Sequence, residues 1–325
     1  MTSAGRDMSE CATTEGVNGR PETIEHQFVV ENECGGWRLD RFLHKKIPRL
    51  SRTRVQRVIR GDCWIDGRAC RPSSTVSAGQ RVTFRRPAPA EPDSPRELPL
   101  LHTDAQFYAL DKPAGIAMHP TAKYHWSTIT SVLREKFVGE ALQITHRLDL
   151  ETSGCLLIAR SRESAVALKR AFAKRWVHKR YRAIVHGDFA AEQLVDAPLG
   201  LAGTLVRVKM AVRADGLPSR TRFVPVSRHG SYTLVDCWPE TGRQHQIRAH
   251  LDHIGHPIVG DKLYPDEKLF ADYQDHGWEA VSAALPLPRQ ALHAAELRFP
   301  HPTTGDEVVV HSALPGDLRA FLEAQ

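Results

Sequence analysis

Polar and ionisable side chains crowd into three short segments of this sequence, more densely than packing alone requires. The first segment, residues 145–154, reads THRLDLETSG and places the carboxylate of Asp149 just ahead of an apolar run that begins at Cys155. Functional groups concentrate on loops that rigid strands hold, and the Thr and Ser hydroxyls nearby can donate hydrogen bonds to a carboxylate. We therefore take Asp149 as a candidate functional carboxylate. The alternative is a solvated turn in which Asp149 caps a backbone amide.

The second and third segments combine aromatic, basic and amide side chains. In residues 179–187, Tyr181 has Lys or Arg neighbours on both sides, which indicates contact with a polyanion; half-buried packing of a strand tyrosine is the alternative. In residues 241–251, Arg243 and Arg248 stand on either side of amide side chains, with His245 between them. Guanidinium groups pair well with phosphates and base edges, so this pattern favours a nucleic-acid ligand.

Histidines around the third segment raise the alternative of a metal site. His250, His253 and His256 are spaced to share one face of a helix. No HExxH motif is present, Asp252 is the only carboxylate at a useful offset, and a Gly-His-Pro sequence ending at residue 257 interrupts the helix. The sequence therefore predicts no bound metal. A metal-dependent hydrolase remains the alternative, which metal analysis of the purified protein would test.

The elements that must position these segments belong to one larger α+β domain, residues 100–325. Leu168, Phe172 and Trp176 recur every four residues, which predicts a helix after Ser164 with these three side chains in the core. Apolar runs predict strands at 107–110, 155–159, 181–185, 232–238 and 308–310.

Residues 26–86 read as a separate small α/β domain, with strand, helix and turn signals in close succession. Its helices begin and end at recognisable N-cap, proline and glycine positions, and an Asp-Gly pair predicts a tight hairpin. The predicted elements are a strand at 27–30, a helix from Leu39 to Ile47 ended by Pro48, a helix from the N-cap Ser51 to Gly61, a hairpin around Asp66-Gly67 and a strand at 82–84.

Basic side chains dominate the helices of this small domain. From Arg41 to Gly61 there are eight Lys or Arg residues and no acidic residue. Solvated helix faces usually mix charge signs to gain ion pairs, whereas a one-signed run repels itself unless a polyanion meets it. We therefore expect RNA or DNA contact here, through Arg41, Arg52, Arg54 and Arg57 among others, with a plain solvated face as the alternative.

Two further segments have the composition of unpacked chain. Residues 1–25 hold almost no large apolar side chain and are predicted as a disordered tail without secondary structure. Residues 87–99 contain five prolines, which predict an extended linker between the two domains.

Composition narrows the class of protein. The 325 residues are 41% hydrophobic and 25% charged, with a net charge of +6. No apolar run approaches the ~20 residues that span a bilayer, and the N-terminus lacks the apolar core of a secretory signal. Six scattered cysteines without a CxxC pair argue against a disulfide framework and a structural zinc site. We expect a cytoplasmic protein that has no membrane partner.

The small domain resembles the RNA-binding domain of ribosomal small-subunit protein four. The matching residues are RLDRFL at 38–43, SRTRVQ at 51–56 and IDG at 65–67, and the resemblance covers about residues 37–84. It implies that this domain binds RNA.

The larger domain resembles the RluA family of pseudouridine synthases along its whole length. The motifs occur in the family's order: DKPAG at 111–115, HRLDLETSG at 146–154, K-x-Y-x-A-x-V-x-G at 179–187, GRQHQIR at 242–248, PIVGDKLY at 257–264, LHA at 292–294 and FPHP at 299–302. Gln244 and Ala249 are minor departures. The resemblance implies a mixed, mostly antiparallel sheet. It also implies an isomerase that breaks the N-glycosidic bond of a uridine in RNA and rejoins the base through carbon, without cofactor or metal.

The resemblance also assigns roles to individual residues. Asp149 matches the family's essential Asp, which acts either as a covalent nucleophile or as a base. Tyr181 matches the tyrosine that packs on the target base and helps to remove its carbon-bound proton. Arg248 matches the active-site arginine, a cation that lowers the pKa of a nearby carboxyl. Arg147 matches the arginine that fills the space left when the uridine flips out of its helix.

Substrate and partners follow from the two resemblances together. We expect a structured RNA, with 23S ribosomal RNA favoured over tRNA because an additional RNA-binding domain suits a large folded substrate. No obligate protein partner is implied, and a monomer is expected. The alternative is a non-catalytic RNA-binding or ribosome-assembly factor, which the loss of Asp149, Tyr181 or Arg248 would have favoured; all three are present.

Overall fold

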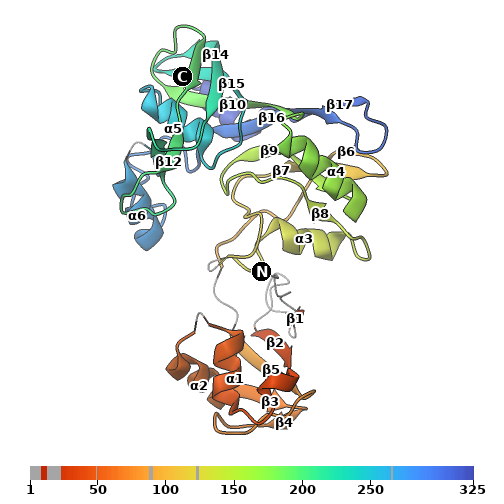
Figure 1. The fold of residues 1–325 in the computed structure, drawn as a ribbon. Helices are drawn as coiled ribbons and strands as arrows, with labels where there is room; N and C mark the ends of the chain where they lie inside the picture. Colours follow the sequence, from red (N-terminus) through yellow and green to blue (C-terminus); the bar gives the residue numbers. More distant parts are fainter. Residues whose placement is uncertain (1–8, 13–22, 49, 88–90, 122–123, 265) are drawn as a thin grey trace. The chain divides into compact units, whose positions relative to one another are not determined.

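The structure is a computed structural model that describes residues 9–12, 23–48, 50–87, 91–121, 124–264 and 266–325. The chain divides into two compact units, Met1–Ala90 and Glu91–Gln325, called here the small and the large unit (Figure 1). No helix among the described residues is long and apolar enough to cross a membrane.

The described part of the small unit is an antiparallel sheet with two α-helices against one face (Figure 1). Its elements are β1 (Ser9–Ala12), β2 (Thr23–Val29), a 3-10 turn (Asn32–Cys34), α1 (Leu39–Lys46), α2 (Arg52–Gly61), β3 (Asp62–Ile65), β4 (Arg68–Ala69) and β5 (Arg81–Pro87), and the strand order is β1-β2-β5-β3-β4.

Local signals account for these elements. The Ser51 hydroxyl accepts a hydrogen bond from the Arg54 amide at the start of α2, and Asp66 and Gly67 both have positive φ, as the tight turn between β3 and β4 requires. Within the predicted tail, residues 9–12 form β1, which pairs with β2, and β2 begins at Thr23, whereas residues 1–8 and 13–22 lie outside the described residues. The backbone of β1 finds its hydrogen-bond partners in β2, and the composition of residues 1–25 does not reveal this pairing.

The large unit contains the elements of all three polar segments. They are β6 (Leu100–Thr103), β7 (Phe107–Lys112), α3 (Ile129–Lys136), β8 (Gln143–Ile144), β9 (Ser153–Ala159), α4 (Arg162–Ala173), β10 (His178–His186), β11 (Gln193–Asp196), β12 (Leu199–Leu201), β13 (Met210–Val212), β14 (Arg220–His229), β15 (Tyr232–Pro239), α5 (Gln246–His253), α6 (Glu267–His276), β16 (Leu292–Pro300), β17 (Glu307–His311) and α7 (Gly316–Glu323).

Within the described residues of the large unit, one ten-stranded sheet runs in the order β11-β14-β15-β10-β16-β9-β7-β6, with β17 beside β16 and β8 beside β9. Every pair in it is antiparallel except β9 with β16. The predicted α+β class with a mixed, mostly antiparallel sheet is confirmed. Helices α3 and α4 lie beside β7 and β9, and α5 lies beside β14 and β15 (Figure 1).

The parallel pair of β9 and β16 is the seam between the two halves of this sheet. Gly154 has φ +110°, and a Cβ atom there would lie 2.2 Å from the Ala294 carbonyl oxygen. Only glycine therefore fits at this point. Asp149 lies on the loop that leads into β9, so the candidate carboxylate precedes the strand that forms this parallel pair.

Two further expectations differ from the structure. The predicted stripe on α4 is buried at Leu168, but Trp176 lies beyond the end of the helix and is 51% exposed, so it is not a core residue. The predicted linker is shorter, because the Glu91 carboxylate accepts hydrogen bonds from the backbone amides of residues 125–127 and Leu98 is buried. These contacts tie residues 91–99 to the large unit.

Candidate active site

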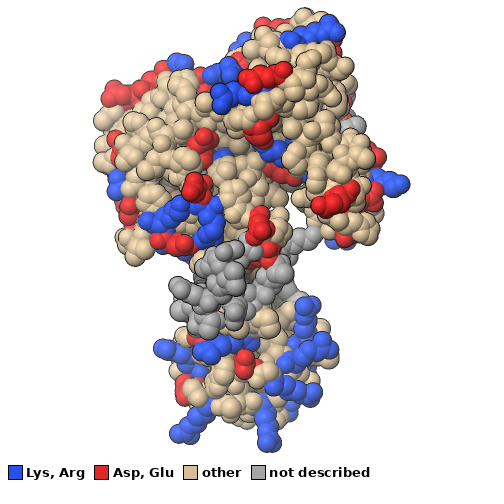
Figure 2. Space-filling view, turned by 180° about the vertical axis from the view of Figure 1, so that it is seen from behind, with Lys and Arg blue, Asp and Glu red and all other residues tan. Residues whose placement is uncertain are grey.

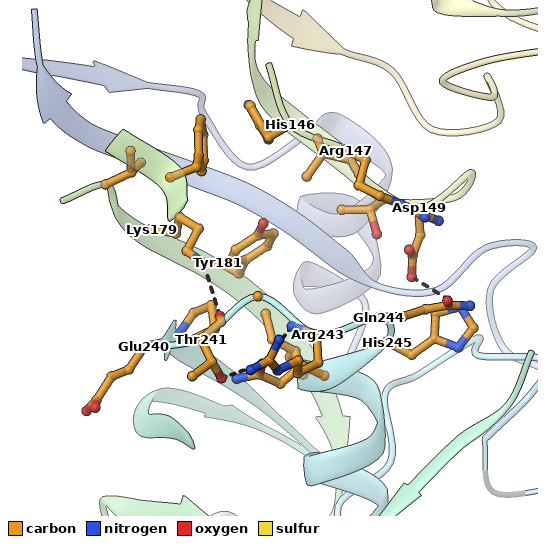
Figure 3. Close-up of a pocket in the computed structure, with 18 of the residues that line it drawn as sticks. His146, Arg147, Asp149, Lys179, Tyr181, Glu240, Thr241, Arg243, Gln244 and His245 are labelled. Atoms are coloured by element: carbon orange, nitrogen blue, oxygen red, sulfur yellow. Dashed lines mark hydrogen bonds and ion pairs between the residues drawn. The ribbon is translucent and has the colours of Figure 1, made fainter. Parts of the chain in front are cut away.

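A pocket of about 630 Å³ opens where the loop before β9, the strand β10 and the start of α5 meet. Figure 3 shows Lys179 and Tyr181 on one side of this pocket, with Arg147 and Asp149 on the loop across from them. The sequence-predicted residues of the large unit all line it, although they come from three separate segments: Arg147, Asp149, Tyr181, Arg243, His245 and Arg248.

The Asp149 carboxylate is paired with a buried arginine. Arg248 Nη1 donates a hydrogen bond to Asp149 Oδ2 at 3.0 Å, and the side chain of Arg248 is only 10% exposed. Burial is the largest single effect and raises the pKa of Asp149, but the charges of Arg248, His245 and Arg147 and the Arg248 hydrogen bond together outweigh it, and the pKa lies below its ordinary value. Asp149 is therefore ionised at neutral pH in a largely desolvated place, where an anionic oxygen can attack a carbon or take a proton.

Asp261 fixes the other side of Arg248. Its two oxygens accept hydrogen bonds from Arg248 Nε at 2.6 Å and Nη2 at 2.9 Å, and the backbone amides of Leu263 and Tyr264 donate to Oδ1. Arg248 thus has a bidentate anchor and keeps its third nitrogen for Asp149. Sequence reasoning gave Asp261 no role. The signal it missed was a lone carboxylate directly after Gly260, in a buried turn.

Tyr181 faces the pocket from β10. The pairing of β10 with β16 shifts register between Arg180 and Tyr181, a bulge of the kind that re-aims a side chain. Burial and the Asp149 charge both raise the pKa of Tyr181, so the phenol is neutral. Its hydroxyl makes no hydrogen bond to any residue that the structure describes, which leaves it available to a ligand in the pocket.

His245 begins α5 in the left-handed conformation, with φ 52°. Its Nε2 lies 3.9 Å from Asp149 Oδ2. Burial, with the Arg248 charge beside it, lowers the pKa of His245 to about 4. The ring is therefore neutral at pH 7 and offers a phosphate no charge, so Arg248 and Arg147 are the cations that keep Asp149 ionised at that pH.

The other two arginines of the pocket, Arg147 and Arg243, differ in their contacts with the protein. Arg147 is exposed and has no hydrogen bond or ion pair among the described residues, whereas Arg243 Nε reaches the Pro218 carbonyl at 3.4 Å. The amide of Gln246 is buried and bonded on both its atoms, holding Thr241 and the Arg243 amide against β14. The Gln246 side chain therefore holds the loop rather than a ligand.

A buried polar network holds the Asp149 loop from behind. Lys112 is fully buried, and its ammonium donates to the carbonyls of Pro113, Leu150 and Thr152 at 2.8–3.1 Å. Burial lowers the pKa of Lys112 to about 7. On the same loop the Glu151 carboxylate accepts a hydrogen bond from Lys262. These supporting residues were not found from the sequence, since nothing local distinguishes a buried lysine from an exposed one.

The histidines of the metal alternative do not converge. Both ring nitrogens of His250 are engaged, with the Thr221 hydroxyl and the Ala197 carbonyl, each at 2.9 Å. His256 Nδ1 lies 3.0 Å from the His186 carbonyl, and His253 is exposed at the end of α5. The three histidines have helical spacing in the sequence, but their side chains do not meet at one point.

The basic side chains of the small unit differ in their contacts, although the sequence presents them as one run. Lys and Arg side chains outnumber acidic ones over the face of the small unit that Figure 2 shows. Arg41 lies 3.9 Å from the centre of the Trp37 ring, and Arg52 pairs at 3.2 Å with the buried Asp40. Arg54 and Arg57 are exposed and have no ion pair among the described residues. Arg52 therefore also has a structural partner, which the absence of acidic residues inside the run did not reveal.

Comparisons with known proteins agree with this geometry. Residues 106–253 match the family model described as RNA pseudouridylate synthase. A ribosomal large subunit pseudouridine synthase D of Xanthomonas campestris pv. campestris is 34% identical, over 92% of both chains. A ribosomal large subunit pseudouridine synthase C of Vibrio cholerae is 30% identical, over 91% of this chain and 96% of that protein.

A solved structure points the same way. Human RNA pseudouridylate synthase domain containing 1 is 26% identical and aligns with a TM-score of 0.54, over 72% of this chain and 97% of that one. The family model spans the loop of Asp149, the strand of Tyr181 and the helix of Arg248, the three elements that form the pocket. The chain therefore belongs to the RluA-type RNA pseudouridine synthases, and it is an isomerase that acts on RNA.

Proposed function

We propose that this enzyme converts one or more uridines of large-subunit ribosomal RNA to pseudouridine, with Asp149 as the essential group. The observation that carries the proposal is the buried ion pair of Asp149 with Arg248 at the wall of an open pocket. The names of the relatives from Xanthomonas and Vibrio support ribosomal RNA as the substrate, in preference to tRNA.

The proposed mechanism gives each pocket residue one task. A uridine stacked in a helix is out of reach, so the base flips out and enters the pocket. Ionised Asp149 then acts on the ribose or the base, and Arg248 keeps it charged. Tyr181 packs on the base, and its free hydroxyl helps to move the proton from carbon. Arg147, exposed at the rim, fills the space that the base vacates, while Arg243 and His245 contact the RNA.

We propose a separate task for the small unit, whose resemblance to the domain of ribosomal small-subunit protein four suggests RNA binding. Arg41, Arg54 and Arg57 are exposed and supply affinity and placement, with Arg52 contributing while it pairs with Asp40. These residues add no group to the chemistry. The enzyme works as a cytoplasmic monomer without metal or cofactor, with RNA as its partner.

The experiment that tests this proposal is pseudouridine mapping. Ribosomal RNA and tRNA are compared from cells with and without the gene, and the same RNAs are then treated with the purified enzyme. We expect one or a few positions of 23S ribosomal RNA to lose pseudouridine in the deletion and to regain it in vitro. Positions affected only in tRNA would overturn the ribosomal assignment, and a deletion that changes no position would overturn the proposed function.

A further inference from the structure

The end of α4 and the turn after it line the active-site pocket, and this turn carries an exposed tryptophan. Phe172, Ala173, Arg175 and Val177 all line the pocket. Trp176 stands between two of these residues, and 51% of its surface is exposed. A large ring that is half exposed beside residues of a polar pocket is unusual, because such rings normally bury most of their surface.

The turn that carries Trp176 is firmly held. Backbone amides of Lys174, Arg175 and Trp176 donate to the carbonyls of residues 170, 172 and 171, at 2.8, 3.1 and 3.0 Å. Arg175 has φ 60°, a left-handed conformation that is costly for a residue with a Cβ atom. The exposed ring therefore belongs to a turn that backbone hydrogen bonds hold in place.

The exposed surface of α4 and of the turn that follows it is strongly basic. Five exposed cations lie on α4 and its turn, against one acidic residue, Glu163, and none of the five has an ion pair among the residues that the structure describes. The Arg170 guanidinium lies 5.9 Å from the centre of the Trp176 ring. The five are Arg162, Lys169, Arg170, Lys174 and Arg175.

We propose that Trp176 is a stacking platform for an unpaired base of the RNA strand that flanks the target uridine, and that the surrounding cations bind the phosphates of that strand. Proteins that hold single-stranded RNA combine an aromatic ring with a basic track in this way, because every base offers a π face. Unpaired cations complement a polyanion, and the residues on both sides of Trp176 in the chain line the pocket that receives the flipped base. This inference rests on the proposed RNA substrate.

The first test compares three variants on the ribosomal RNA fragment that the wild-type enzyme modifies. Trp176→Ala removes the ring and Trp176→Phe keeps an aromatic face. Val166→Ala is the matched control, since Val166 is an apolar residue of α4 that is 62% exposed and does not line the pocket. We expect Trp176→Ala to weaken binding about 5- to 100-fold, with Trp176→Phe close to wild type and the control unchanged. The single-turnover rate at saturating enzyme changes much less, because the Asp149 site is intact.

The second test locates the base. Abasic substitutions are placed one at a time beside the target uridine, and binding is measured with wild type and Trp176→Ala. We expect one position whose abasic form weakens wild-type binding and has no further effect in the variant, as coupling of ring and base requires. Wild-type affinity in Trp176→Ala, or effects that simply add at every position, would overturn the inference. A wild-type enzyme that modifies no RNA would instead overturn the proposed function.

Discussion

Removing the cation beside Asp149 should move the acid limb of the pH–rate profile to higher pH. Arg248 Nη1 lies 3.0 Å from Asp149 Oδ2, and without it burial is opposed only by the charges of His245 and Arg147. Loss of an adjacent opposite charge raises a carboxyl pKa by about 1–3 units, or about 1.4–4 kcal/mol. The reaction needs ionised Asp149, so the rate falls as pH drops through this pKa. A higher pKa places that fall at higher pH.

The choice of variant follows from the shared carboxylates. Arg248→Gln alone would leave Asp261 buried and charged without its ion-pair partner, a loss of about 3–5 kcal/mol in stability. Arg248→Gln combined with Asp261→Asn removes both charges and leaves a neutral pair. Arg243→Gln is the matched control, because Arg243 lines the same pocket and has no contact with Asp149.

The assay is the single-turnover rate at saturating enzyme between about pH 5 and 8, where the RNA stays folded. We expect wild type and Arg243→Gln to lose no rate to protonation of Asp149 in this window, because the pKa of Asp149 lies below its ordinary value. The double variant should be slower and should lose rate progressively as pH falls. If the double variant has the same flat profile as the wild type, Arg248 does not control the ionisation of Asp149, and the electrostatic reasoning is refuted.

Three further predictions concern the basic helix, the phenol and metals. Replacing Arg54 and Arg57 with Gln should weaken RNA binding and reduce its log–log salt slope by about 0.7–0.9 for each RNA phosphate that the helix no longer neutralises, as binding at several salt concentrations will show; an unchanged slope would mean a plain solvated face. Tyr181→Phe should leave the melting temperature unchanged, since the hydroxyl makes no hydrogen bond within the described residues, while the single-turnover rate falls; an unchanged rate would exclude a role for the hydroxyl. EDTA should leave activity intact when the RNA remains folded, and a loss that zinc restores would revive the histidine-based hydrolase.

The strands and helices that could be predicted are those with strong local signals. The apolar run at 155–159 is β9, and Ser51 caps α2 as expected. Trp176 was misassigned because its spacing continued the helical pattern past the end of α4. Nothing in the local sequence of β1 announces its pairing with β2, because the partner strand supplies the hydrogen bonds.

In the active site too, residues in recognisable local motifs could be predicted, whereas residues that act through distant contacts could not. Asp149, Tyr181 and Arg248 stand in dense polar segments, and the pocket brings them together. Asp261 and Lys112 act through contacts with residues that are distant in the chain. Asp261 binds Arg248, 13 residues away, and Lys112 binds the carbonyl of Thr152, 40 residues away. One sequence cannot show such pairings, since a buried ion pair depends on the fold that desolvates it.

The most direct test of the central claim is the Asp149→Asn variant, measured for pseudouridine formation on the ribosomal RNA fragment that the wild type modifies. The change is nearly isosteric and removes the charge, and Asp252→Asn on α5, outside the pocket, is the matched control. We predict no detectable pseudouridine from Asp149→Asn, with RNA affinity and melting temperature close to wild type, and a normal rate from Asp252→Asn. Turnover by Asp149→Asn at a rate comparable to wild type would contradict the assignment of Asp149 as the essential group.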